Sequence, residues 1–107
     1  MDNYNVKVTE EATLDLIQIY SYICTEFNSP QYAIKQTDRI RTAIRSLDVL
    51  PLRFKIVTFE PWSSMNIRQF PIDNFIIYYS VDEQMKTVDI LRIFSSKQDI
   101  ENKINDW

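Results

Sequence analysis

Two helix-length apolar patterns, separated by only three residues, place the tightest limit on how this chain can fold. In the first, EEATLDLIQIYSYICTEF, the apolar residues recur at steps of three or four: Ala12, Leu16, Ile19, Ile23 and Phe27. The second is carried by Ala33, Thr37, Ile40, Ile44 and Leu47. Because only the residues NSP lie between them, the two helices must be antiparallel neighbours. The sequence therefore predicts a helical hairpin.

The ends of both helices are marked by residues that favour helix starts and stops. Thr9 offers a side-chain oxygen as the N-cap of the first helix, and the two glutamates after it place negative charge in the first turn. Ser29 is the expected N-cap of the second helix, with Pro30 at the first helical position, where its missing N–H is harmless. The Leu50–Pro51 step closes this helix.

Strand patterns precede and follow the hairpin. Before it, Tyr4 to Thr9 alternates apolar and polar residues, as a half-buried strand does. After it come three strand-like runs: Met65–Phe70, Phe75–Val81 and Thr87–Phe94. Their connections, PIDN and DEQMK, have hairpin lengths, so these strands should be adjacent and antiparallel. Asp73–Asn74 and Asp82–Glu83 must form the turns without glycine, and Asn and Asp tolerate positive φ best.

The remaining segments are less regular. Arg53 to Ser64 predicts a loop with a short strand at KIVTF, and a short helix is expected from Lys97 to Asn105. No linker or repeat interrupts the pattern, so residues 1–107 predict a single domain. The order strand, helix, helix, three strands and short helix indicates an α+β fold, in which an antiparallel sheet packs against the N-terminal helical hairpin.

The composition excludes several kinds of site. The chain has no histidine and one cysteine, Cys24, which excludes Ser–His and Cys–His catalytic pairs, imidazole zinc sites and an intramolecular disulfide. We therefore expect no structural metal and no cofactor. A net charge of −3 argues mildly against nucleic-acid binding, although a local basic patch is compatible with it. The N-terminus has no signal-peptide pattern and no apolar run reaches the ~18 residues of a membrane span, so we expect a cytoplasmic protein.

Two arginines stand inside otherwise apolar strand patterns, Arg68 in IRQFP and Arg92 in ILRIF. The first helix contains the pattern "A..DL..I..YI", formed by Ala12, Asp15, Leu16, Ile19, Tyr22 and Ile23, and the second helix ends with Ile44, Leu47 and Pro51. The strands carry a third set of residues: Ile67–Arg68, Phe70–Pro71, Phe75, Ile77, Tyr79, Val81–Asp82, Val88, Ile90–Ile93 and Asp99. In these motifs the chain resembles the RelE/ParE superfamily of toxins, over roughly Tyr4 to Ile100.

The resemblance implies the toxin of a bacterial type II toxin–antitoxin, or plasmid stabilisation, module. RelE and YoeB are ribosome-dependent mRNA endoribonucleases, whereas ParE-type members poison DNA gyrase. For the ribonuclease branch, Arg68 and Arg92 match the arginines that contact the scissile phosphate, and Glu60 lies near the catalytic glutamate of YoeB-like members. Cleavage through a 2′-hydroxyl needs a base, cations for the developing charge, and an acid for the leaving oxygen. A guanidinium suits the second task because its planar donors fit two phosphate oxygens.

The expected acid is absent at its usual position. Ser95 stands where many members have the histidine of "RILH", and a serine hydroxyl is too weak an acid to protonate a leaving alkoxide. Tyr78 or Tyr79 could replace it, but packing is the commoner role in a central strand. This departure favours a ParE-like inhibitor of gyrase, or another non-nuclease route. An mRNA endoribonuclease is the alternative, and a weakly active or inactive binding protein is the third hypothesis.

Each candidate residue also has a plain structural explanation. Arg68 and Arg92 could pair with a carboxylate across the sheet, at Asp89, Asp73 or Glu60. Glu60 could be a solvated loop residue, and Trp62 a local packing anchor instead of a base-stacking platform. The arginines of the second helix, Arg39, Arg41 and Arg45, are spread around it as on a solvated face.

The resemblance also implies partners. A cognate antitoxin is expected to wrap its C-terminal segment across the grooves of the sheet and helices, through exposed apolar patches and the arginines. A toxin–antitoxin hetero-oligomer would follow. The target would be DNA gyrase in the ParE-like hypothesis, or the ribosome with mRNA in the alternative.

Overall fold

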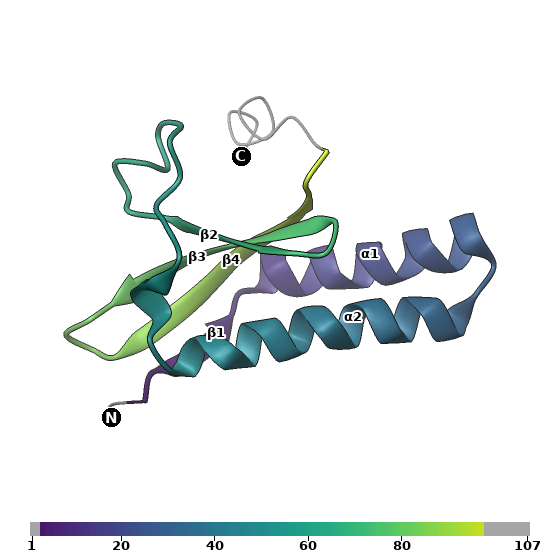
Figure 1. Cartoon of the computed structure of the whole chain (residues 1–107), viewed down its shortest axis with the longest axis horizontal. Helices are drawn as coiled ribbons and strands as arrows, with labels where there is room; N and C mark the ends of the chain where they lie inside the picture. Colours follow the sequence, from purple (N-terminus) through teal and green to yellow (C-terminus); the bar gives the residue numbers. More distant parts are fainter. Residues whose placement is uncertain (1–2, 98–107) are drawn as a thin grey trace.

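The computed structural model describes residues 3–97, which form a helical hairpin packed on a four-stranded sheet (Figure 1). The helices are α1 (Glu10–Phe27) and α2 (Pro30–Arg45), followed by short 3-10 turns at Ser46–Asp48 and Pro51–Arg53. The strands are β1 (Asn5–Val8), β2 (Arg68–Ile72), β3 (Phe75–Asp82) and β4 (Thr87–Ser95). None of the helices within these residues is long and apolar enough to cross a membrane.

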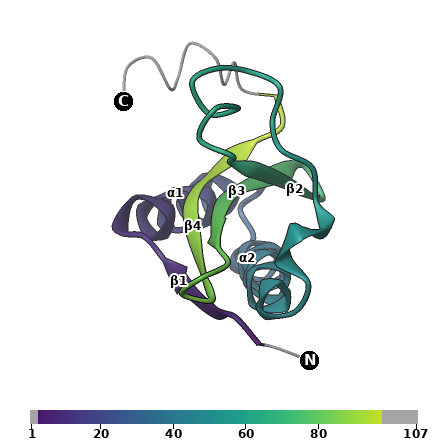
Figure 2. The same ribbon diagram turned by 90° about the vertical axis from the view of Figure 1, so that its left-hand side faces the viewer.

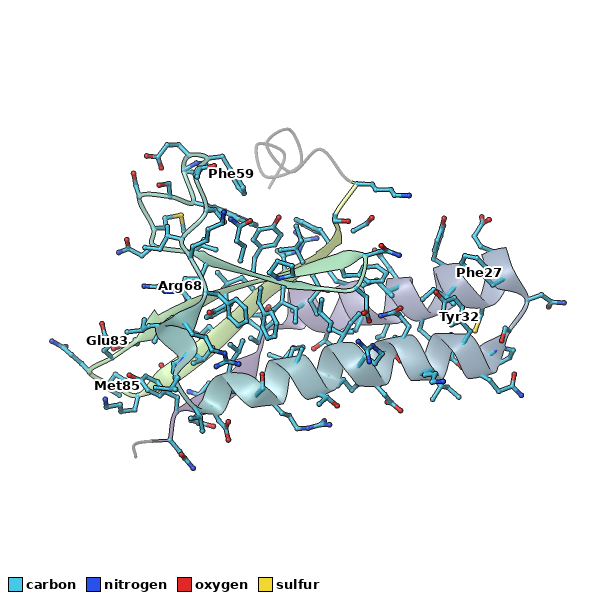
Figure 3. The ribbon with its side chains drawn as sticks, viewed as in Figure 1. Phe27, Tyr32, Phe59, Arg68, Glu83 and Met85 are labelled. Carbon is cyan, nitrogen blue, oxygen red and sulfur yellow. The ribbon has the colours of Figure 1, made fainter. Side chains whose placement is uncertain are left out.

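The helical hairpin forms as the sequence predicts. The Thr9 hydroxyl accepts a hydrogen bond from the Ala12 N–H, and Ser29 caps α2 by accepting from the Tyr32 N–H. The predicted face of α2 is buried throughout, from Ala33 to Leu47. The α1 stripe is buried at Ala12, Leu16 and Ile23, half-buried at Ile19 and exposed at Phe27. Phe27 instead packs edge-on against Tyr32 at the tip of the hairpin, which extends beyond the sheet (Figures 1 and 3).

The sheet has the strand order β1-β4-β3-β2 and is mixed, not wholly antiparallel. The predicted antiparallel pairing is confirmed for β2 with β3 and for β3 with β4. The N-terminal strand β1, however, pairs in parallel with β4, from Asn5 opposite Thr87 to Val8 opposite Ile90. The helical hairpin makes this possible, because it returns the chain along the sheet before the three C-terminal strands begin.

The boundaries of β2 differ from the prediction. The strand begins at Arg68, not Met65, and it includes Pro71, which was expected to lie in the connection. Pro71 fits because β2 is an edge strand, where a missing N–H breaks no ladder bond. The predicted KIVTF strand is reduced to a single bridge between Ile56 and Arg68. Apart from Lys97, the predicted C-terminal helix lies outside the described residues.

In the described part of the chain, five residues other than glycine adopt left-handed backbone conformations: Asn28, Leu50, Asn66, Asp73 and Lys86. Asp73 confirms the expected turn between β2 and β3. In the following turn, Asp82 contributes its carboxylate, which accepts from the N–H groups of Gln84 and Met85, while Lys86 takes the positive φ.

The two faces of the sheet carry separate cores. In Figure 2, the loop that precedes β2 extends from the strands on the side away from α2. On the helix face, residues of α1 and α2 pack against Ile77, Tyr79, Ile90 and Ile93. On the opposite face, here called the loop face, the segment between the second 3-10 turn and β2 covers the sheet. Its core consists of Val57, Trp62, Ile67, Tyr78 and Phe94. The neighbours Tyr78 and Tyr79 therefore point to opposite faces, as the alternation of a strand requires.

Candidate functional site

A groove of about 490 Å³ lies between α1 and β4. It exists because β1 ends opposite Ile90, so the following residues of β4 have no strand beside them on that edge in the described part of the chain. Its lining combines apolar and polar side chains: Asp15, Gln18, Ile19, Tyr22, Phe75, Arg92, Ile93, Phe94 and Ser95. The groove therefore contains one of the predicted site residues, Arg92, and the departure at Ser95.

Arg92 is bound by Asp15 of α1. The Arg92 Nε and Nη2 atoms donate to the two oxygens of the Asp15 carboxylate, at 2.8 and 3.0 Å. The same carboxylate accepts from the backbone N–H of Ile93 at 2.9 Å. The Asp15 side chain is 8 % exposed and that of Arg92 17 %, so the pair is largely shielded from water. The Arg92 guanidinium also lies over the Phe94 ring, 4.4 Å from its centroid.

Arg68 has a different environment at the opposite edge of the sheet. Its Nη1 atom donates to two backbone carbonyl groups, those of Leu52 at 3.2 Å and Phe54 at 2.7 Å. The adjacent Pro51 carbonyl accepts from the Tyr79 hydroxyl at 2.6 Å. Arg68 and Tyr79 thus hold the segment after α2 through its carbonyl oxygens. Figure 3 shows Arg68 at this end of the sheet, below the loop that carries Phe59.

Glu60 lies in that loop and binds its own neighbours. Its two carboxylate oxygens accept from the N–H of Ser64 at 2.8 Å and from the Ser64 hydroxyl at 2.6 Å. These hydrogen bonds hold the pKa of Glu60 below its usual value. A carboxylate stabilised in this way is a weaker base than an unbound one.

The two central tyrosines are poor proton donors. Burial raises the pKa of Tyr78 and of Tyr79 to about 12. Both rings are almost completely buried, which agrees with packing. Ser95 lies at the groove, and its hydroxyl accepts from the N–H of Lys97 at 3.3 Å. None of these groups offers an acid suited to a leaving alkoxide at neutral pH.

The structure does not gather the predicted residues into one place. Arg68 lies on the edge strand β2 and binds carbonyl groups of the segment after α2, whereas Arg92 lies on β4 and binds Asp15 of α1. Glu60 is bound to Ser64, and neither arginine pairs with the carboxylates suggested by the sequence. Within residues 3–97, no three His, Cys, Asp or Glu side chains form a group that could hold a metal ion.

The remaining candidates have structural roles. Trp62 is buried against Tyr78 on the loop face, with ring centroids 5.0 Å apart, so it is a packing anchor. Arg39 binds both oxygens of Asp73 at 2.7 and 3.0 Å. Arg41 is on the exposed surface of α2, where it pairs with Asp38 at 3.5 Å.

Comparison with known proteins identifies the family. Residues 6–100 match the model of the ParE toxin of the type II toxin–antitoxin system, parDE. This chain belongs to the ParE toxin family. A comparison with curated protein sequences gave no match.

Solved structures agree with the fold of a ParE-family protein. The chain is similar to one from a chromosomal ParDE system of P. aeruginosa, with 23 % identity and a TM-score of 0.71 over 86 % of this chain and 95 % of that chain. It is also similar to one from the RelBE2 toxin–antitoxin complex of Mycobacterium tuberculosis, with 23 % identity and a TM-score of 0.62 over 89 % and 93 %. These similarities confirm the predicted RelE/ParE-like fold.

In this ParE-family chain, the binding of Arg92 by Asp15 was not predicted, and Asp15 was expected only as part of the helical motif. The sequence nevertheless contained a signal for this contact, in the position of Asp15. Asp15 lies three residues after Ala12 and four before Ile19, within the buried stripe of α1. A carboxylate buried among apolar residues requires a cation or N–H donors, and the sequence offered Arg92 as a cation in a strand.

Proposed function

We propose that this ParE-family protein is a growth inhibitor that acts on DNA gyrase, or by another route that cuts no RNA, and that a cognate antitoxin neutralises it. The support comes from the family match over residues 6–100 and from the state of the predicted phosphate-binding residues. Gyrase is a cytoplasmic target, and a cytoplasmic location is part of the proposal.

The Asp15–Arg92 pair carries the proposal. A scissile phosphate would have to displace the Asp15 carboxylate, which also accepts from the Ile93 N–H. Removing a carboxylate from two partners in a shielded setting is costly, because the N–H and the guanidinium both lose their acceptor. Arg68 would likewise have to release the carbonyl groups of Leu52 and Phe54. Binding to a protein target requires neither rearrangement.

The missing acid supports the same conclusion. Ribonuclease chemistry needs a proton donor for the leaving oxygen. Ser95 has a weakly acidic hydroxyl, and Tyr78, which lies opposite Arg92 in the sheet, has a pKa of about 12. Inhibition by binding needs no proton transfer. It is therefore compatible with Ser95 in place of histidine.

The antitoxin partner is supported by the solved structures that are similar to this chain. One comes from a ParDE toxin–antitoxin system and the other from a RelBE2 toxin–antitoxin complex. Large apolar side chains that remain exposed on the helices are suited to such a partner, among them Leu14, Ile17, Tyr22 and Ile34.

The test is induction of the chain in a bacterial host that lacks the antitoxin. We expect growth arrest with SOS induction and trapped DNA breaks, while mRNA remains intact. Codon-positioned cuts in mRNA with rapid loss of translation would overturn the proposal in favour of the endoribonuclease. Unimpaired growth with neither signal would instead favour the inactive binding protein.

The antitoxin has its own test. We expect the antitoxin to be a small protein encoded beside this gene; its co-expression should restore growth, and the two proteins should copurify. Growth arrest that continues despite expression of this neighbour, with no copurification, would contradict the assignment of that neighbour as antitoxin.

A further inference from the structure

The charges of the two helices are divided unequally. α1 carries four carboxylates, at Glu10, Glu11, Asp15 and Glu26, and contains no lysine or arginine. α2 and the turn after it carry most of the nearby cations, at Lys35, Arg39, Arg41, Arg45 and Arg53, against Asp38 and Asp48. Although the whole chain has a net charge of −3, the α2 side of the hairpin is therefore basic.

A second groove lies on this basic side, between α2 and the edge strand β2. Its volume is about 570 Å³. Apolar side chains form part of its lining, and charged or hydroxyl-bearing side chains surround them: Lys35, Asp38, Arg39, Thr42, Ala43, Ser46, Phe70 and Ile72. An adjoining hollow of about 430 Å³ shares Lys35 and Arg39. Both hollows therefore lie beside cations of α2.

The charges around this groove leave it positive. Its carboxylate, Asp38, is paired with Arg41. The nearby Asp73 carboxylate is bound by Arg39 and by the Gln36 amide at 2.9 Å. The ammonium group of Lys35 is exposed, and no described carboxylate lies within 4.0 Å of it. Lys35 is therefore available to an incoming carboxylate.

The neighbouring sheet edge cannot accept a further strand in the usual way. The Gln69 N–H, which points outward from β2, donates to the Lys55 carbonyl at 3.1 Å. Pro71, the next outward-facing residue, has no N–H. A partner on this side must therefore be recognised through side chains. An amphipathic helix fits this requirement, because its own backbone hydrogen bonds are already satisfied.

We infer that the α2–β2 groove binds an acidic amphipathic helix of the antitoxin. The apolar face of the helix would contact Phe70 and Ile72, and its carboxylates would approach Lys35. The neutral Asp15–Arg92 pair and the acidic α1 make the α1–β4 groove less suited to such a helix. This inference rests on the proposed function, since it assigns the place where the proposed partner binds.

Substitutions in the complete complex test this inference. Lys35→Glu introduces repulsion in the groove, and Lys7→Glu makes the same change on the exposed face of β1, at the other side of the sheet. We expect Lys35→Glu to weaken antitoxin binding by roughly tenfold at low ionic strength, mostly through slower association, and by less at high salt. Lys7→Glu should have a much smaller effect. Titration calorimetry and stopped-flow association at two salt concentrations measure both.

A second variant tests the shape of the groove. Thr42→Trp places a large ring in the groove and should weaken binding at every salt concentration, whereas Gln84→Trp, in the exposed turn between β3 and β4, is its control. Circular dichroism and thermal unfolding of each free variant establish that it is folded.

The possible results separate the inference from the proposed function. Antitoxin binding that tolerates both Lys35→Glu and Thr42→Trp would overturn the inference and leave the proposed function standing. An effect of these variants on self-association of the free chain, with antitoxin affinity unchanged, would assign the groove to a second copy and also overturn it. If the wild-type chain forms no complex with the antitoxin, the inference and the proposed partner both fail.

Discussion

The two arginines of the sheet, Arg92 on β4 and Arg68 on β2, are bound by different kinds of partner. Beside β4, the Asp15 carboxylate binds Arg92 and the Ile93 N–H. At β2, Arg68 donates only to backbone carbonyl oxygens. The first arrangement depends on one ionised group, the Asp15 carboxylate, which binds both the Arg92 guanidinium and the Ile93 N–H. In the second arrangement, the acceptors are uncharged carbonyl groups of two residues in the segment after α2, Leu52 and Phe54.

This difference predicts how each edge responds to a single substitution. Removing the shared carboxylate affects a guanidinium and a backbone N–H at once, so the loss is concentrated at one residue. At the β2 edge, Tyr79 also donates to the same segment, through the Pro51 carbonyl. The loss of any one donor there leaves the others in place.

The largest expected effect is that of Asp15→Ala. The variant removes the acceptor of Arg92 and of the Ile93 N–H, and it should lower the free energy of unfolding by about 3 kcal/mol. Urea denaturation measures this value. Asp15→Asn is the control because its amide oxygen can still accept one of these hydrogen bonds, and its loss should be smaller. Equal losses for Asp15→Ala and the exposed Asp38→Ala would contradict a special role of the pair.

A smaller effect is expected for Arg68→Ala. It removes two hydrogen bonds to the carbonyl groups of Leu52 and Phe54, and should lower the free energy of unfolding by roughly 1.5 kcal/mol. Toxicity should decline only in proportion to the folded fraction, and lower temperature should restore it. Complete loss of toxicity in a stably folded Arg68→Ala protein would show that the guanidinium acts on the target.

Tyr79→Phe sharpens the comparison at the same edge. The variant keeps the buried ring but removes the hydroxyl that donates to Pro51, so we expect a loss of about 1 kcal/mol. Tyr22→Phe, on an exposed side chain, should change the unfolding midpoint very little. If Tyr79→Phe and Tyr22→Phe have the same free energy of unfolding, the Tyr79 hydroxyl does not stabilise the segment after α2.

The smallest expected effect concerns the pH dependence at the β2–β3 turn. Hydrogen bonds from Arg39 and Gln36 hold the pKa of Asp73 below its ordinary value of 3.8. Because the folded-state pKa is lowered, this contribution to stability is present above pH 4 and is lost as the pH falls through the lower, folded-state pKa. Asp73→Asn should make stability less dependent on pH in this acid range, as measured by urea unfolding. An unchanged slope would contradict the role of this carboxylate.

Much of the fold followed from local signals. The helix caps at Thr9 and Ser29, the buried face of α2 and the three C-terminal strands depend on neighbouring residues in the sequence, and all were predicted. The parallel pairing of β1 with β4 was not, because no local pattern records which strand lies beside another. Pro71 was placed in a loop since its role as an edge residue depends on the same strand order.

The site was less predictable for the same reason. Arg68 and Arg92 were recognised as unusual, but their partners lie far away in the sequence: Arg92 binds Asp15, 77 residues away. Arg68 binds backbone carbonyl groups, which every residue has and which therefore leave no trace in the sequence. Only the apolar periodicity of the first helix, which places Asp15 in the apolar stripe, indicated one of these contacts.

The turns of this chain have a consequence for its unfolded state. Within residues 3–97, five positions with positive φ are occupied by residues that have side chains, and the sequence contains no glycine. Such residues are less favourable than glycine in the left-handed conformation of the folded protein. In the denatured ensemble, however, every residue has a more restricted backbone than glycine would have. Folding therefore removes less backbone entropy per turn, which offsets part of the conformational strain.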